Sequence, residues 1–396
     1  MHYIRLLRAP KLVQAKRATQ VSLVLAVTTD LGDSLLHPDK AIELMARAVV
    51  TSPSGTSTRE LSGSGKLHWR PGDRVSKPTF DLPPTVVAAL ASGDRVELCV
   101  GPAPPYSAEA LRDILASSAE YASGAGDRGL VMPVWVALKE DESQDDLCTR
   151  KLRLNELSEP PDYLELEEEL GESIARHIWD ASPVVLAALA AMFQSPSSVP
   201  SRQPCMEALK RLFDASEPIN ILELGCGVGI LGAGLAAVYP PDAGACTILM
   251  TDLEDAQDRA RTNIGLVERN QSGRAGLLYE NLDWEDGRHG RFGPLLRRRR
   301  WDLVMLSDCT YNTDTLPALV ATLSAVHAHN ADHGDGGRRA VSTKVFLATK
   351  QRHSSERVAW HLLARDGWEE LATQTFPLPV LGRESQFIET YLFENK

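Results

Sequence analysis

The sequence predicts an α/β protein in which a doubly wound parallel sheet follows a smaller β-rich N-terminal domain, and three observations predict this fold. From residue 180 onward, strand-like apolar segments alternate with helix-like segments, which is the pattern of βαβ units. The glycine-rich turn ELGCGVG, residues 223–229, joins one of these strands to a helix. Residues 1–138 contain strand-like segments separated by Gly-, Ser- and Pro-rich turns.

Length and composition agree with two globular domains. The chain has 396 residues, of which 43% are hydrophobic and 24% are charged. We place a β-rich domain at residues 1–150 and the α/β domain at residues 151–396. The charge run at 139–146 is expected to be a solvated loop, and the acidic stretch at 156–172 is expected to separate the two domains.

The charge and cysteine content exclude several classes of protein. A net charge of −11 argues against a phosphate-backbone binder, so we expect no direct nucleic-acid partner, whereas an acidic surface suits a basic protein. No apolar run approaches the ~20 residues that span a bilayer, so no membrane partner is expected. The six cysteines form no C-x-x-C pair, which favours reduced thiols in the cytoplasm, with the nucleus as an alternative.

The N-terminal domain is predicted from four strand-like segments and one helical segment. We expect strands at 21–29, 41–50, 95–100 and 130–138, and a helix at 108–121. Residues 2–29 carry basic residues and no acidic residue, as a transit peptide does. The β-branched content of 21–29 favours a folded strand over a targeting segment.

The second domain is predicted as a series of alternating elements. Strands are expected at 220–227, 246–252, 275–281, 301–308, 343–350, 368–376 and 385–393. Helices are expected at 180–193, 205–213, 230–239, 254–268, 315–328 and 355–367. In such Rossmann-like sheets ligands bind beyond the carboxyl ends of the strands, where the strand order reverses. Gly225, Asp252 and Asp308 each stand at such a strand end.

The glycine turn and the next strand end together predict a nucleotide-like cofactor site. Glycines at 225, 227 and 229 allow the backbone to turn tightly and approach a ligand, although a plain strand-to-helix turn is the alternative. The dinucleotide pattern would need glycine at 230, where the chain has Ile230. Asp252 lies near the offset at which an acid meets ribose hydroxyls, or it caps the following helix.

The stretch DCTYN, residues 308–312, places a carboxylate and a phenol beyond the fourth strand. Asp308 either serves a site there or caps the helix that starts near Thr313, and Tyr311 either lines that site or packs. Cys309 has no histidine base tied to it by sequence and is not proposed as a nucleophile. The arginine run 297–300 is interpreted as a solvated insertion, and the histidine-containing stretch 327–337 as a surface loop; we expect no metal site.

Residues from about 171 to 393 resemble the seven-β-strand protein lysine methyltransferases known as methyltransferase family 16. The matching pieces occur in order: WDA at 179–181, ELGCGVGILG at 223–232, TDL at 251–253, LDW at 282–284 and DLVMLSDCTYN at 302–312. The motif SDCTYN and the long N-terminal extension are most similar to those of fungal members that modify translation elongation factors. The resemblance implies a seven-stranded class I methyltransferase fold and the cofactor S-adenosyl-L-methionine.

The resemblance also implies which residues form the site. Cofactor contacts fall on the glycine loop, two tryptophans and two strand ends: Trp179, Glu223, Gly225, Cys226, Gly227, Gly229, Asp252, Trp284 and Ser307. Cys226 is expected to contribute its backbone N–H. Asp308 and Tyr311 are the expected catalytic residues, because Asp308 can hold an incoming ammonium and Tyr311 can hydrogen-bond the amine or wall its channel.

The sequence therefore predicts a monomeric, S-adenosylmethionine-dependent protein-lysine N-methyltransferase, with a translation elongation factor (2 or 3) as the expected protein substrate. The N-terminal domain is expected to help dock that substrate. Four alternatives stay open. Three are enzymes: methylation of a protein histidine or N-terminus, of a small molecule, or of RNA. The fourth is a non-catalytic binding protein that keeps the cofactor fold.

Overall fold

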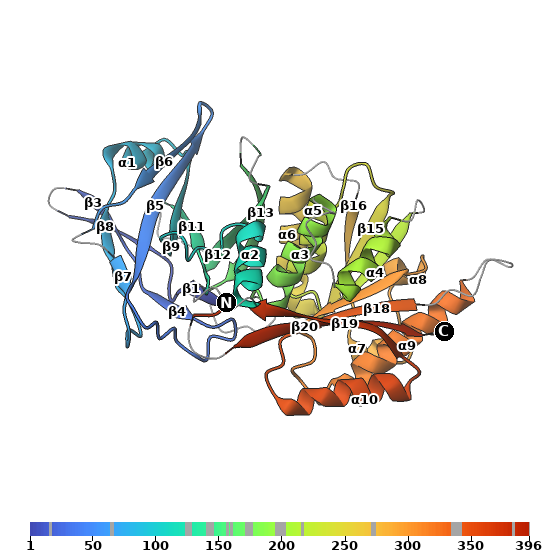
Figure 1. Cartoon of the computed structure of the whole chain (residues 1–396). Helices are drawn as coiled ribbons and strands as arrows, with labels where there is room; N and C mark the ends of the chain where they lie inside the picture. The colour runs from blue at the N-terminus through green and yellow to red at the C-terminus, as the bar shows by residue number, and fades with distance from the viewer. Residues whose placement is uncertain are drawn as a thin grey trace. The chain divides into compact units, whose positions relative to one another are not determined.

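The computed structural model describes residues 1–15, 18–63, 67–122, 129–139, 146–155, 158, 161–170, 177–194, 203–214, 218–270, 275–333, 343–381 and 385–395, with the backbone alone at 118–122. The chain forms two compact units (Figure 1). The first comprises Met1–His177 and Pro379–Ser385, and the second comprises Ile178–Leu378 and Gln386–Lys396. Most of the charge run 139–146 lies outside the described residues.

The predicted boundary at residue 150 is wrong, because it falls inside a strand of the first unit. Strand β12 (Leu147–Asn155) pairs with β13 (Asp162–Glu169) and with β11 (Val134–Leu138). The acidic stretch that was expected to separate the domains therefore contains β13. Leu164, Leu166 and Glu168 of β13 are buried, and Glu168 pairs there with Arg150. The other glutamates lie between these positions, so the segment is acidic although it is a strand.

The first unit consists of three sheets and two helices. A seven-stranded sheet has the order β13-β12-β11-β9-β5-β6, with β7 paired to β5; the three-stranded sheets are β10-β1-β4 and β2-β3-β8. The remaining elements are β1 (His2–Leu6), β2 (Lys11–Gln14), β3 (Thr19–Ser22), β4 (Leu25–Thr28), β5 (Ile42–Ser52), β6 (Gly55–Glu60), β7 (Leu67–Trp69), β8 (Thr79–Asp81), β9 (Arg95–Pro102), β10 (Val131–Met132), α1 (Pro84–Ala91) and α2 (Leu111–Ala122). The predicted strand at 21–29 is confirmed as strand structure, in two pieces.

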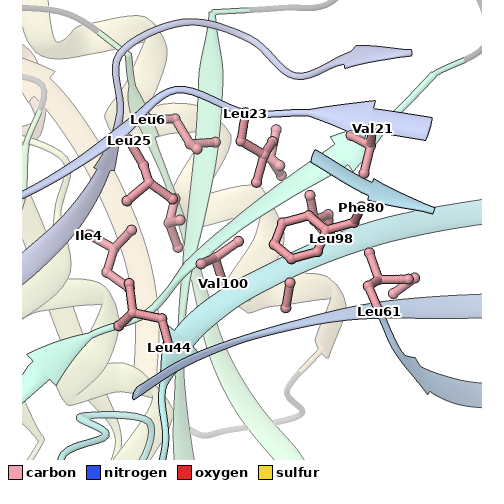
Figure 2. Packing of buried hydrophobic residues seen from close by; sticks show 14 of the residues in the cluster. Ile4, Leu6, Val21, Leu23, Leu25, Leu44, Leu61, Phe80, Leu98 and Val100 are labelled. Atoms are coloured by element: carbon pink, nitrogen blue, oxygen red, sulfur yellow. The ribbon is translucent and has the colours of Figure 1, made fainter. Parts of the chain in front are cut away.

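Alternation along the strands builds the core of the first unit. Residues 44, 46, 48 and 50 of β5 are buried, and their neighbours along the strand are less so. Figure 2 shows Leu44 of β5, Leu98 and Val100 of β9, and Ile4 of β1 among the side chains of this core cluster. The basic segment 2–29 thus contributes strands and core residues to this unit.

The second unit contains a seven-stranded sheet of order β16-β15-β14-β17-β18-β20-β19. Its strands are β14 (Ile219–Leu224), β15 (Cys246–Asp252), β16 (Ala275–Asn281), β17 (Leu303–Ser307), β18 (Thr343–Thr349), β19 (Glu369–Leu378) and β20 (Gln386–Asn395). All pairs are parallel except those of β20, which runs antiparallel to β18 and to β19. The predicted doubly wound α/β fold is confirmed.

Helices cover both faces of this sheet. Figure 1 shows α3, α4, α5 and α6 on one face and α7, α9 and α10 on the other. Their bounds are α3 (Ala181–Gln194), α4 (Pro204–Phe213), α5 (Ile230–Val238), α6 (Glu254–Asn270), α7 (Trp284–Gly287), α9 (Leu316–Asp332) and α10 (Val358–Arg365), with the short α8 (Pro294–Arg297) and the 3₁₀ turn η2 (Ser354–Arg357). In the described part of the chain no helix combines the length and apolarity needed to cross a membrane.

Helix α9 corrects one prediction about a loop. Residues 327–332 were expected to belong to a surface loop, but they form the last turns of α9. Asn330 is fully buried there, and its amide accepts from the Trp301 N–H and donates to the Trp301 carbonyl and to Thr343. These bonds anchor the end of the helix, which the composition of the stretch did not indicate. Residues 334–337 lie outside the described residues.

The strand order places the loops after β14 and β17 side by side. These two strands are neighbours, and the chain leaves β14 toward β15 on one side and β17 toward β18 on the other. This is the switch point of a doubly wound sheet, where ligands bind beyond the carboxyl ends of the strands.

Candidate functional site

The glycine loop leaves β14 in a conformation that glycine adopts readily. Gly225, Gly227 and Gly229 have φ values of 70°, 54° and 88°, in the left-handed region. The N–H groups of Gly225 and Cys226 both donate to the carbonyl of Thr251. This differs from the expectation that Cys226 offers its N–H to a cofactor, because β15 already uses that donor.

Two of these glycines also lack the space for a side chain. A Cβ on Gly225 would lie 2.7 Å from Cys309 Sγ and 3.2 Å from Cζ2 of Trp284, and a Cβ on Gly229 would lie 2.2 Å from Met250 Cε. The indole of Trp284 and the loop after β17 therefore pack directly against the glycine loop. Trp284 and Cys309, which are far from Gly225 in the sequence, thus lie beside it at the carboxyl ends of the strands, where the site was predicted.

Glu223 fixes the glycine loop to the start of α5 and is not exposed to solvent. Its side chain is buried, and Oε2 accepts from the Gly232 N–H at 3.0 Å in the first turn of α5. A Cβ on Gly232 would lie 2.3 Å from that oxygen, which explains the glycine. Burial raises the pKa of Glu223 to about 8, and the negative charge of Asp252 adds to the rise while the Gly232 N–H opposes it.

Asp252 ends β15 beside the loop. One carboxylate oxygen accepts from the Gly227 N–H and the other from the Leu253 N–H, each at 2.7 Å. Burial raises the pKa of Asp252, and these two N–H donors oppose the rise. Each oxygen keeps a lone pair, so the carboxylate can still accept from a diol. The side chain of Leu253 is exposed; the sequence interpretation missed it, although an apolar residue after a strand-end acid was a visible signal.

Trp284 and Ser307 are held in place by backbone and helix contacts. Asp283 caps α7 by accepting from the Glu285 N–H, and Trp284 is the first residue of that helix. Ser307, at the end of β17, accepts from the Ser182 hydroxyl of α3 at 2.8 Å. Both predicted cofactor residues therefore lie at the same edge of the sheet as Gly225.

Asp308 connects three segments of the second unit. Its Oδ2 accepts from the Ala181 N–H at 2.8 Å, and its Oδ1 accepts from the Lys350 N–H at 3.0 Å and from Arg352 Nη1 at 2.9 Å. The side chain is 1% exposed, and φ is 52°, which aspartate tolerates better than most residues. The carboxylate thus already holds a cation that the protein itself supplies.

An aromatic pair stands beside this carboxylate. The rings of Trp179 and Tyr311 are nearly parallel, at 7°, with their centroids 6.2 Å apart, and Tyr311 is 49% exposed. Burial raises the pKa of the Tyr311 phenol, so it stays neutral at physiological pH. The Arg352 guanidinium carbon lies 4.8 Å from the Trp179 ring centroid. Arg352 was missed by the sequence interpretation, although it follows the strand next to β17.

Cys309 is a packing and hydrogen-bonding residue. Its thiol lies 3.3 Å from the carbonyls of Leu224 and of Ser307, and burial raises its pKa far above the ordinary value. All six cysteines of the chain are free and buried. Among the described residues no cluster of His, Cys, Asp and Glu side chains has the arrangement of a metal site.

A sheet of this order, with a glycine loop after its first strand and an acid after its second, defines a class I S-adenosylmethionine-dependent methyltransferase. The sequence model of the lysine methyltransferase family matches residues 158–365, and the chain belongs to this family. Membership of this family gives S-adenosylmethionine as the methyl donor. The residues present fit it, because the close-packed glycine loop, the Asp252 lone pairs and the Trp284 indole stand at one sheet edge.

The chain is similar to a UPF0665 family protein of Schizosaccharomyces pombe, with 26% identity over 372 residues that cover 93% of this chain and 94% of the relative. Among solved structures, a SAM-dependent methyltransferase from Methanosarcina mazei shares 12% identity over 47% of this chain and 96% of its own, with a TM-score of 0.31. An arsenic(III) S-adenosylmethionine methyltransferase from Chlamydomonas reinhardtii shares 14% identity over 45% of this chain and 64% of its own, with a TM-score of 0.30. TM-scores this low define no closer relationship.

Proposed function

We propose that this chain methylates the side-chain amine of a lysine in a protein. The observation that carries the proposal is the aromatic pair of Trp179 and the half-exposed Tyr311, which stands at the same sheet edge as the glycine loop. Flat apolar walls suit the aliphatic stem of a lysine and leave its nitrogen unpaired. Membership of the lysine methyltransferase family supports the same acceptor.

The residues around the glycine loop are proposed to hold the cofactor. Asp252 would accept from the ribose hydroxyls, and the exposed side chain of Leu253 would lie against the adenine. Trp284 and Trp179 would flank the cofactor on either side of the loop, and Ser307 would contact it from the end of β17. Gly225, Cys226, Gly227 and Gly229 would form the loop surface, with Glu223 fixing it from below.

S-adenosylmethionine would supply an electrophilic methyl group in this site. The chain's own residues then have to orient the amine in line with that methyl group and keep it free of water, since positioning provides most of the acceleration. We assign the wall of the amine channel to Tyr311. Asp308 was expected to hold the incoming ammonium, but both its oxygens bind protein donors, so we propose that it positions the wall instead.

The proposed substrate is a translation elongation factor in the cytoplasm, met by a monomeric enzyme. The acidic chain suits a basic partner, and the first unit, with its large sheet, is the proposed docking domain. The choice of an elongation factor as substrate rests on the motif SDCTYN and on the length of the N-terminal region.

The test is transfer of tritium-labelled methyl groups to a lysate from cells that lack this protein, with mass spectrometry of the labelled residue. We expect a labelled lysine in one elongation factor, and roughly tenfold slower labelling by the Asp252→Ala variant at sub-saturating S-adenosylmethionine, because this variant lacks the proposed ribose contact. Label found only on small molecules, RNA, histidines or N-termini would contradict the lysine proposal. Absence of S-adenosylhomocysteine binding by calorimetry would indicate a non-catalytic binding protein.

A further inference from the structure

Arg352 stands where the acceptor is proposed to enter, and it is bound on two sides. Nη1 donates to Asp308 Oδ1 at 2.9 Å and to the Lys350 carbonyl at 3.1 Å. The guanidinium also lies over the Trp179 ring. A carboxylate and an aromatic face hold the planar guanidinium in one orientation, so its charge has a fixed position.

The charged side chains near Arg352 differ in their exposure to solvent. The charged and titratable groups packed around it are Asp308, Glu356, Lys350, Asp180, Tyr311 and His353. Lys350 and Asp180 form a buried ion pair at 2.8 Å. Glu356 is buried, and its carboxylate accepts from the backbone N–H of Arg352. Asp308 is 1% exposed, whereas the Arg352 side chain is 17% exposed.

In the Arg352–Asp308 ion pair, the Arg352 guanidinium is therefore the group exposed on the side where the acceptor lysine is proposed to bind. Its field extends to Tyr311: burial raises the pKa of that phenol, Cys309 and Asp252 add to the rise, and the charge of Arg352 opposes it. A lysine that lies against this aromatic pair would meet a positive charge. A fixed cation nearby disfavours the ammonium form of a lysine and leaves the neutral amine unaffected.

We propose that Arg352 keeps the acceptor lysine in its neutral, nucleophilic form by placing a fixed cation beside the aromatic pair that receives it. The inference rests on the proposed lysine methylation. The ammonium releases its proton to bulk water, and the nitrogen lone pair forms the new N–C bond while the electron pair of the methyl–sulfur bond goes to sulfur. The product is a methylammonium, which the same cation repels.

The test uses single-turnover labelling, which works before the acceptor protein has been identified. Enzyme is kept in excess over the acceptor in the lysate from cells lacking the protein, and the rate of lysine labelling is followed from pH 6 to 10 with tritium-labelled S-adenosylmethionine. Varying the enzyme concentration separates the saturating rate from the half-saturating concentration. The saturating rate reports the ionisation of the bound lysine.

Removing the charge with Arg352→Gln is expected to lower the saturating rate at pH 7 by roughly tenfold, because the bound lysine then titrates about one pH unit higher. The rate should approach that of the wild type at high pH, and the half-saturating concentration should not rise. Arg352→Lys keeps the charge and should keep the wild-type midpoint. Unaltered S-adenosylhomocysteine binding shows that the variants fold.

Arg357→Gln is the matched control. Arg357 also pairs with a carboxylate, Glu389, and also lies over a tryptophan, Trp360, but it does not bind Asp308. Its removal should leave the pH profile unchanged. A uniform loss of rate in Arg352→Gln with the wild-type midpoint would overturn the inference and leave a structural role. Wild-type enzyme that labels no lysine would overturn the proposed function itself, and with it this inference.

Discussion

Asp308 offers the sharpest test of how the site is held together. Asp308→Ala removes the acceptor of two backbone N–H groups, at Ala181 and Lys350, and of the Arg352 guanidinium. Breaking a buried ion pair costs about 3–5 kcal/mol, and the three contacts share one carboxylate and do not add independently. Alanine at φ 52° adds about 1 kcal/mol of backbone strain.

We therefore expect Asp308→Ala to destabilise the second unit by about 5 kcal/mol, which lowers its Tm by roughly 10–20 °C. Differential scanning fluorimetry measures the shift, and hydrogen exchange at the amides of Ala181 and Lys350 should accelerate. Asp308→Gly relieves the strain but not the lost contacts, so it should recover only about 1 kcal/mol.

Asp308→Asn tests the same contacts with a smaller change. Asparagine tolerates a positive φ and keeps one carbonyl oxygen, so the loss should lie between those of the wild type and the alanine variant. A cost below about 1 kcal/mol for Asp308→Ala, with unchanged exchange at both amides, would refute the assignment of Asp308 as the connecting residue.

Three further predictions concern the cofactor side. Burial raises the pKa of Glu223 to about 8, so the folded chain keeps a proton that the unfolded chain releases above about pH 4, and the free energy of unfolding falls as the pH rises toward 8. Glu223→Gln should remove this fall, which urea unfolding between pH 5 and 9 measures. An unchanged dependence on pH in the variant would contradict the raised pKa. Gly229→Ala should weaken S-adenosylhomocysteine binding in calorimetry by roughly tenfold, because alanine at φ 88° is strained by about 1–2 kcal/mol and its Cβ would also displace Met250 Cε. Near-native affinity would show that the loop adapts. Asp252 binds hydroxyls best when ionised, and its pKa is raised, so cofactor affinity should weaken as the pH falls and should drop roughly tenfold in Asp252→Ala at pH 7; a pH-independent affinity would argue against the ribose contact.

The parts of the molecule that were predicted correctly depend on short stretches of sequence. Strand and helix periodicity located the second unit's elements, and the glycines of 223–229 indicated a ligand-binding turn. The errors arose where polar composition concealed regular structure. The glutamates of β13 resembled a linker, and the histidines at the end of α9 resembled a loop, because buried partners such as Trp301 and Thr343 are distant in the sequence.

The sequence by itself determined the fold class, the place of the glycine turn and the place of Asp308 and Tyr311 beyond the fourth strand, since each depends on a local pattern that folds in only a few ways. The tertiary structure alone decided what Asp308 binds. Its partners Ala181 and Arg352 lie on segments 127 and 44 residues away, and no spacing rule links them. The sheet order brings β17 and β18 together and seats α3 against their ends, so the carboxylate expected to receive a substrate cation holds the protein's own arginine instead.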